Sequence, residues 1–383
     1  MPSGGLDMAL NNYKLGDLLM RNSEENKDLI YGISDVRGVR NAKGISNTKI
    51  DVSGRNLKTF LVVRPGGFIF NHRVHDKLGL GYNTSDETYI FTNDYVSFYV
   101  KPEVKNRILL PDYLYMWYLR PEFDRYMLFK TYGSATLFFS WDNMCELEIE
   151  LPDLPTQQKY VDVYNAMVAN QQAYERSLED LKLTCDAYIE DLRRKMPCEK
   201  IGRYIERHDI RNGKNGSKNV MGISTSKQFR EPTSKVNKNE LANYKVCHPR
   251  QIGFVQTTHN EKVFTYAFNN TKEDIVVSSV NEVFSTQEDK LYPEYLCMFF
   301  NRTEFDRYAR FHSWGSARET FTWNDLIEVK IPIPDIAIQK SIAEMYTVYN
   351  KRKKINEQLK AQIKNICPIL IRGSLEDGGE PNG

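Results

Sequence analysis

The sequence lacks the features that mark membrane proteins, secreted proteins and general polycations. No run of 18 apolar residues occurs among the 383 residues, so no transmembrane helix is predicted. The first residues do not form a basic segment followed by an apolar one, so no signal peptide is expected. The formal net charge is only +2, which excludes a polycation. These absences predict a soluble cytoplasmic protein.

Paired cysteines and familiar catalytic motifs are missing as well. The six cysteines form no Cys-x-x-Cys pair, which argues against a zinc ribbon and a disulfide framework. We expect most of them to be small buried side chains in a reducing cytoplasm. The sequence has no Gly-x4-Gly-Lys-Ser/Thr phosphate loop, no Asn/Asp-Pro-Pro-aromatic methyltransferase motif and no His-Glu-x-x-His zinc motif. The chain is therefore predicted to do no chemistry of its own.

What the sequence does contain is one segment that occurs twice. Residues 113–168 align with residues 295–350 at a constant offset of 182, without a gap. The matched residues include Arg120/Arg302, Phe123/Phe305, Tyr126/Tyr308, Trp141/Trp323 and Gln157/Gln339. A repeat of this length predicts two similar domains in one chain. Duplicated domains tend to be related by a pseudo-twofold axis, and duplex DNA has matching symmetry.

Two short motifs could suggest a metal site or a nuclease site, but comparison of the two copies argues against both. His72 and His75 have a spacing that could suggest a metal site, but the second copy lacks them, so we interpret them as a polar loop. Glu328 and Lys330 could suggest the Glu-x-Lys of a nuclease. The first copy has Glu-Leu-Glu there, and the Pro-Asp dipeptides follow the triplet instead of preceding it. We therefore expect neither a metal nor a nuclease site.

Each copy opens with a variable part, residues 13–112 and 200–294, that is rich in short β-type runs and polar loops. Basic residues are in excess in the same part of both copies. Nine Lys and Arg face three acids between residues 35 and 77, and thirteen face five between residues 200 and 262. A solvated loop surface would explain either segment alone. The coincidence in both copies favours a surface that faces a polyanion.

Each copy closes with a long predicted helix. A heptad pattern of apolar residues runs between Pro155 and Pro197, and about 40 residues at 1.5 Å each make a rod of about 60 Å. A similar stripe follows residue 337. Two such stripes in one chain must be buried, and each other is the simplest partner. The alternative is that each helix packs on its own domain.

These patterns predict an α+β fold with two pseudo-twofold related mixed α/β domains joined by two long antiparallel helices that form a coiled coil. The expected boundaries are domain 1 at 1–154, spacer helix 1 at 155–197, domain 2 at 198–336 and spacer helix 2 at 337–373. Residues 374–383 are Gly-rich and acidic, and we expect them to form a flexible tail.

The closing segments of the two repeats resemble those of one known family. They read Gly133-Ser134-Ala135, Trp141, Leu151-Pro152-Asp153 and Gln157 in the first copy, and Gly315-Ser316-Ala317, Trp323, Ile333-Pro334-Asp335 and Gln339 in the second. A Gly-Ser element, an apolar-Pro pattern and a Gln that starts a long helix are typical of the specificity subunits of type I restriction-modification systems. Ala337 departs from this pattern, because the first copy and many relatives have Pro there.

The resemblance implies a function and a set of partners. Domains 1–154 and 198–336 would be target recognition domains that each read half of a split double-stranded DNA sequence, and the helices would set the gap. Two modification subunits, which bind S-adenosylmethionine and methylate adenine, would dock on the chain. Two restriction subunits that use ATP and Mg would complete the nuclease. The chain itself would hold no catalytic residue, metal or cofactor.

Certain loops of the two variable parts are the candidates for contacting DNA, because base edges and phosphates are bound by Arg, Lys, Asn, Gln, His, Ser and Thr. These loops follow Gly32-Ile33-Ser34 and Phe68-Ile69-Phe70 in the first copy, and Gly222-Ile223-Ser224 and Gly253-Phe254-Val255 in the second. In the first domain the candidate residues are Arg37, Arg40, Lys43, Asn71, His72, Arg73 and Lys77. In the second they are Ser226, Lys227, Gln228, Arg230, Thr257, Thr258, His259 and Asn260. Two alternatives stay open: a coiled-coil scaffold that joins two protein-binding domains without DNA, and a fragment of a split methyltransferase.

Overall fold

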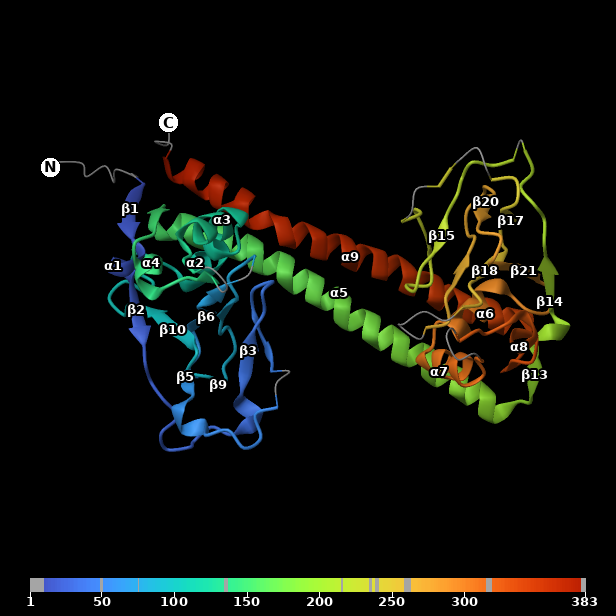
Figure 1. Ribbon diagram of the computed structural model, residues 1–383, viewed down its shortest axis with the longest axis horizontal. Coiled ribbons are helices and arrows are strands. Elements are labelled where there is room, and N and C mark those ends of the chain that lie inside the picture. Colours follow the sequence, from blue (N-terminus) through green and yellow to red (C-terminus); the bar gives the residue numbers. More distant parts are fainter. Residues whose placement is uncertain are drawn as a thin grey trace. The chain divides into compact units, whose positions relative to one another are not determined.

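The computed structural model divides into two compact units, and neither coincides with one half of the chain (Figure 1). The first unit comprises Met1–Gln172 and Glu357–Gly383, and the second comprises Ala173–Asn356. The structure describes residues 10–48, 51–74, 76–133, 137–214, 216–233, 236–237, 241–257, 263–314 and 319–379. Within these ranges no helix is both long enough and apolar enough to cross a membrane.

The first unit is organised around a four-stranded antiparallel sheet in the order β2-β10-β6-β8 (Figure 1). Its strands are β2 (Leu19–Asn22), β10 (Tyr95–Val100), β6 (Phe68–Asn71) and β8 (Leu80–Tyr82). Four further pairs are β1 (Asn11–Lys14) with β12 (Glu148–Leu151), β3 (Arg37–Val39) with β4 (Ile45–Asn47), β5 (Leu61–Val63) with β9 (Tyr89–Phe91), and β7 (Arg73–Val74) with β11 (Leu137–Phe138). The short helices are α1 (Leu15–Leu18), η1 (Ile33–Asp35), η2 (Leu57–Thr59), α2 (Pro111–Tyr118), α3 (Pro121–Lys130) and α4 (Trp141–Cys145).

Both faces of this sheet are buried, because successive side chains of a strand point to opposite sides. Phe68 and Phe98 lie on one face, where their rings meet Tyr118 of α2 edge-on at 6.1 and 6.2 Å. Ile69 lies on the other face and packs with Phe91 of the β5–β9 pair. The sheet is therefore the middle layer between helices and a second layer of short strands.

The second unit repeats most of this architecture. Its central sheet has the order β14-β21-β18-β19, with β14 (Ile205–His208), β21 (Glu282–Thr286), β18 (Ile252–Phe254) and β19 (Tyr266–Phe268). The flanking pairs are β13 (Cys198–Lys200) with β22 (Lys330–Pro332), β15 (Gly222–Ile223) with β16 (Phe229–Arg230), and β17 (Lys245–Cys247) with β20 (Ile275–Val277). The short helices are η3 (Ile201–Arg203), α6 (Pro293–Phe300), α7 (Thr303–Phe311) and α8 (Trp323–Ile327). The predicted duplication is thus confirmed, and it includes the variable parts.

Strand register also repeats, although the residues differ. In the first unit Phe70 of β6 lies opposite Val96 of β10, and in the second Phe254 of β18 lies opposite Glu282 of β21. Leu61 and Lys245 are also equivalent. Leu61 is the first residue of β5, which pairs with β9, and Lys245 is the first residue of β17, which pairs with β20. The two units therefore share a frame in which particular positions have changed from apolar to charged.

A buried glutamine connects the long helix to the rest of the unit in both copies. Gln157 is fully buried; its Oε1 accepts from the Leu110 backbone N–H at 3.0 Å, and its Nε2 donates to the Ile108 and Pro152 carbonyls at 2.8 and 2.9 Å. Gln339 makes the same three bonds in the second unit. This explains why a glutamine recurs at the start of each long helix.

Two equivalent glycines permit a close approach between short helices. A Cβ on Gly202 of η3 would lie 2.7 Å from both the Cβ and the carbonyl oxygen of Ile327 in α8. A Cβ on Gly16 of α1 would lie 2.9 Å from Cys145 Cβ in α4. Carbon atoms do not approach so closely, so any side chain here would force the two elements apart.

We expect Gly202→Ala to lower the free energy of unfolding by about 1 to 3 kcal/mol, the usual effect of inserting a methyl group into a well-packed contact. Urea denaturation followed by circular dichroism measures it. Gly222→Ala is the matched control in the same unit, because a Cβ there would be at least 3.7 Å from its neighbours. Equal stability of the two variants would contradict the packing argument.

Each unit contains one end of both long helices, α5 (Leu154–Lys195) and α9 (Ile336–Gly379). In the first unit Lys159 of α5 forms an ion pair with Asp377 of α9 at 2.6 Å. In the second, Ser177 accepts a hydrogen bond from Arg352, and Ile189 joins the same core cluster as Ile342. Early residues of α5 thus meet late residues of α9, which confirms the antiparallel arrangement within each unit.

The helix ends also pack into the core of their own unit, as the alternative interpretation expected. Val161, Cys367 and Ile371 belong to the same buried cluster as the aromatic side chains of α2 and β6. Cys185 and Ile189 belong to the corresponding cluster of the second unit. The helices therefore contact both each other and the domain at their end, so the two interpretations are not exclusive.

The prediction that a flexible tail begins at residue 374 is wrong for residues 374–379. Helix α9 continues through Gly379. Ser374 is fully buried, and its hydroxyl lies 2.6 Å from the hydroxyl of Tyr113 in α2. The composition of this segment is that of a solvated tail, but contacts with Tyr113, Lys159 and Tyr160 hold it as a helix.

Candidate nucleic-acid interface

A hairpin in each unit carries several of the predicted DNA-contacting residues, and one lysine fixes each hairpin. The two lysines are Lys43, between β3 and β4, and Lys227, between β15 and β16; their φ angles are 63° and 61°. Lys227 donates to the Phe300 carbonyl at 2.6 Å and pairs with Asp306 at 2.8 Å. Lys43 makes the same two contacts with residues of α2 and α3, and pairs with Asp124 at 2.9 Å.

Both ammonium groups are turned inward. The side chains of Lys43 and Lys227 are 4% and 8% exposed. Burial lowers the pKa of both groups, and the ion pairs oppose that shift only in part. We therefore do not retain Lys43 and Lys227 as DNA contacts: the geometry gives them the role of anchors that hold each hairpin to the helices.

The other predicted residues of the β3–β4 region lie at or near the surface of the first unit. Arg37 is half-buried; it donates to the backbone carbonyls of Ser34 and Val36, and its guanidinium lies 4.5 Å from the ring centre of Tyr89. Arg40 is exposed. Of these two, only Arg40 presents a largely free surface to a ligand.

A second group of predicted residues follows β6 in the first unit. The Asn71 side chain accepts from the Arg73 backbone N–H at 3.0 Å, and the His72 ring stacks on Phe138 at 5.5 Å. The Arg73 side chain is 55% exposed, and Lys77 is exposed. The structure thus brings Arg73 and Lys77 to the surface and gives Asn71 and His72 contacts within the unit.

In the second unit, Ser226, Gln228 and Arg230 are all exposed on the β15–β16 hairpin. The Ser226 hydroxyl lies 2.6 Å from that of Ser224. Thr257 is half-buried and bridges to Thr320 at the end of the adjoining segment. Thr258, His259 and Asn260 lie outside the described residues. The contacts of these residues with DNA stay predictions.

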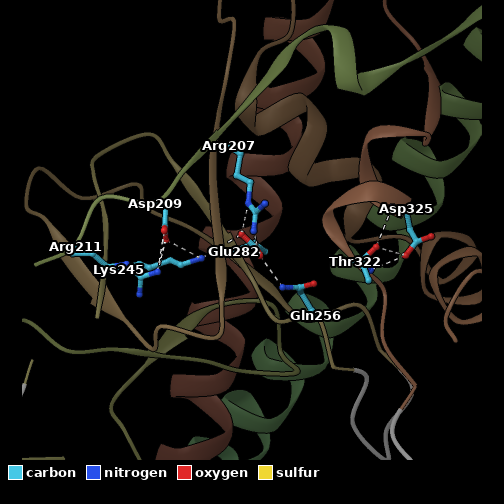
Figure 2. A network of polar contacts seen from close by, with 8 residues as sticks. All are labelled: Arg207, Asp209, Arg211, Lys245, Gln256, Glu282, Thr322 and Asp325. Atoms are coloured by element: carbon cyan, nitrogen blue, oxygen red, sulfur yellow. Dashed lines mark hydrogen bonds and ion pairs between the residues drawn. The ribbon is translucent and has the colours of Figure 1, made fainter. Parts of the chain in front are cut away.

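Reasoning from the sequence missed a network of charged and amide groups in the second unit (Figure 2). At its centre is Glu282 of β21, which is 2% exposed. Its carboxylate accepts from Arg207 Nε and Nη2 at 2.8 and 2.6 Å and from Gln256 Nε2 at 2.7 Å. Lys245 Nζ lies 3.3 Å from the same carboxylate. Four groups from four segments thus converge on one another.

Asp209 and Arg211 extend this network toward the surface (Figure 2). Asp209 lies 3.3 Å from Lys245 Nζ and 2.8 Å from Arg211. The hydrogen bond to Glu282 raises the pKa of Arg207, and the hydrogen bond from Arg211 lowers the pKa of Asp209, so these groups keep their charges. Together with Gln256, Ser279 and Val280 they line a cleft of about 590 Å³.

The sequence held a signal for this network, but it was too weak to use. Lys245 and Glu282 stand where the first unit has the apolar Leu61 and Val96. The strand registers reveal these equivalences, and the offset between the copies changes from 184 at Leu61 to 186 at Val96. In the part of the chain that the structure describes, no cluster of His, Cys, Asp and Glu could hold a metal ion.

Comparison with known proteins indicates the class of domain to which the second unit is similar. Residues 199–365, from β13 into α9, match the family model described as the type I restriction modification DNA specificity domain. The second unit is therefore similar to the DNA specificity domains of type I restriction-modification systems.

A solved structure supports the fold of the whole chain. The S subunit of a type-I restriction-modification system from M. genitalium is 10% identical, with a TM-score of 0.58 over 100% of this chain and 99% of that chain. This likeness shows the shared fold alone. The HsdS subunit from Thermoanaerobacter tengcongensis is 13% identical over 96% of this chain and 95% of that chain, with a TM-score of 0.36. No curated protein matches significantly.

Proposed function

We propose that the chain is the DNA-specificity subunit of a type I restriction-modification complex, and that each unit reads one half of a split target. The observation that carries the proposal is the pair of units with one topology and different surface side chains. The hairpin of the first unit presents Arg40, whereas that of the second presents Gln228 and Arg230. A common frame with different polar loops suits two readers of different half-sites.

In this proposal, DNA recognition uses two kinds of contact: charged contacts with phosphates and hydrogen bonds to base edges. Exposed cations such as Arg73, Lys77 and Arg230 would neutralise phosphates, which fixes register and makes binding sensitive to salt. Amide and guanidinium groups on the loops would contact base edges in a groove, where each base pair has its own donor and acceptor pattern. In this proposal α5 and α9 act as the ruler between the half-sites.

The proposal includes partners that supply the chemistry. Two modification subunits would dock on the chain, bind S-adenosylmethionine and methylate adenine. Two restriction subunits would add ATP- and Mg-dependent cleavage. The chain would act in the cytoplasm and contribute no catalytic residue, because its role is to position the methyltransferase on a chosen sequence.

Expression of the chain with its methyltransferase is expected to produce adenine methylation at a two-part DNA motif with a fixed gap. Genome-wide mapping of methylated adenine, with and without this chain, measures it. The purified complex should then bind the correctly spaced motif at least about tenfold more tightly than a single half-site or a motif whose gap is changed by a few base pairs, because only the correct gap allows both units to contact bases. Equal affinity for all three DNAs would contradict the ruler.

A further inference from the structure

We propose that Arg207 and Gln256, both held by the buried carboxylate of Glu282, read one G·C base pair in the half-site of the second unit. The proposal rests on the function proposed above and adds which side chains carry one position of the target. Glu282 is a positioning residue in this arrangement, since it acts on the DNA only through the two side chains that it holds.

Arg207 is fixed along one edge and open along the other. Its Nε and Nη2 both donate to Glu282, and its guanidinium lies 6.0 Å from the ring centre of Trp323. The side chain is 49% exposed, and its bonds to Glu282 use Nε and Nη2, so that Nη1 lies on the opposite edge of the guanidinium. A guanidinium held in this way has already lost its rotational freedom, so less entropy is lost when it binds. It can present N–H donors to the O6 and N7 acceptors of guanine.

Gln256 is oriented by the same carboxylate. Its Nε2 donates to Glu282 at 2.7 Å, which leaves Oε1 as the free end of the amide. Its backbone carbonyl accepts from the Phe321 N–H at 2.8 Å, so the residue is held at both ends. An acceptor beside a donor matches a G·C pair, in which cytosine offers its N4 amino donor next to the two acceptors of guanine.

The fold does not need this network, which is why we assign it to recognition. The first unit builds the same sheet with Val96 in place of Glu282 and Leu61 in place of Lys245. A buried charge costs free energy even when it is paired, and apolar residues of similar size often stabilise a fold as well or better. A buried, paired carboxylate in one of two sibling units therefore points to a task that this unit alone performs.

The surroundings of the network also suit a base edge. The cleft of about 590 Å³ is lined by the cations Arg207, Arg211 and Lys245 and by the acids Asp209 and Glu282. It is open to solvent on the side of Arg211, whose side chain is 43% exposed. Gln256 precedes the segment 257–260 that was predicted to contact DNA. A slightly positive, partly desolvated cleft at the root of that segment can admit one edge of a base pair.

Mapping the methylated motif with variants of the full chain, expressed with its methyltransferase, tests the proposal. Arg207→Ala is expected to reduce the preference for G·C at a single position of one half-site by about tenfold to a hundredfold, the usual discrimination of a bidentate contact, and to leave the other half unchanged. Glu282→Gln should relax the same position, because it loses the ionic hold on Arg207. Arg203→Ala, at an exposed arginine of the same unit outside the network, should leave the motif intact.

The outcomes separate this proposal from the one on which it rests. An unchanged motif with Arg207→Ala, or a loss of methylation that is spread evenly over both halves, would overturn the role of Arg207 while the two-part motif stands. Absence of a two-part motif with the unaltered chain would instead refute the proposed function. Arg207→Lys keeps the positive charge but not the planar set of N–H donors, and it serves as the control for a folding defect. We expect it to reduce the preference for G·C at that position while affinity for unrelated DNA stays unchanged.

Discussion

Replacing Gln157 by leucine is expected to lower the free energy of unfolding by about 4 kcal/mol, because three buried backbone groups lose their partner at an estimated 1 to 3 kcal/mol each and leucine restores part of the loss as apolar burial. The groups are the Leu110 N–H and the carbonyls of Ile108 and Pro152. These bonds tie the start of α5 to the segment before α2. Urea denaturation followed by circular dichroism measures the change.

The neighbouring residue provides a matched control. Gln158 is exposed, and its amide donates only to Asp162 one turn along the same helix. Gln158→Leu should therefore change stability by no more than about 0.5 kcal/mol, as is usual for surface positions. Gln339→Leu should behave like Gln157→Leu, since it breaks the equivalent three bonds. If Gln157→Leu and Gln158→Leu proved equally stable, the buried bonds would not hold the helix.

Replacing Lys227 by methionine is expected to lower the free energy of unfolding by about 3 kcal/mol, because removal of one member of a buried ion pair leaves the other charge without its partner. Asp306 is 17% exposed and would keep one donor, the Phe264 N–H at 3.0 Å, so we place the effect at the lower end of the usual range. The Phe300 carbonyl at the end of α6 would also lose its donor.

A double-mutant cycle identifies the ion pair as the cause. Removing both charges, with Lys227→Met and Asp306→Asn together, should cost at least about 1 kcal/mol less than the sum of the two single changes, since neither charge is then left alone. Lys218→Met, at an exposed lysine of the same unit, is the control and should have little effect. Strict additivity would show that the two side chains do not stabilise each other.

The fold was largely predictable because its strongest signals are local or repeated. The unbroken stretch between Pro155 and Pro197 predicted a helix, and α5 begins and ends within two residues of the expected bounds. The recurrence of Trp141 as Trp323 predicted two similar domains. The segment after residue 373 was misjudged, because its helix depends on Tyr113 and other residues far away in the chain.

The interface was less predictable, because exposure cannot be read from residue type. Lys43 and Lys227 stand in basic loops and looked available to DNA, but the carboxylates of Asp124 in α3 and Asp306 in α7 draw them inward. Glu282 and Gln256 looked like ordinary strand and loop residues. They meet only because β21 and β18 are neighbours in the sheet, a pairing between strands about thirty residues apart that no local pattern specifies.

The sharing of both long helices between the units has a consequence for biosynthesis. Cys367, Leu370 and Ile371 complete the core of the unit that also contains the first strands of the protein. A ribosome must therefore translate as far as residue 371 before the segments that contain β2 and β6 can close their apolar surface. A premature stop codon before residue 367 would therefore leave the core around β2 and β6 incomplete.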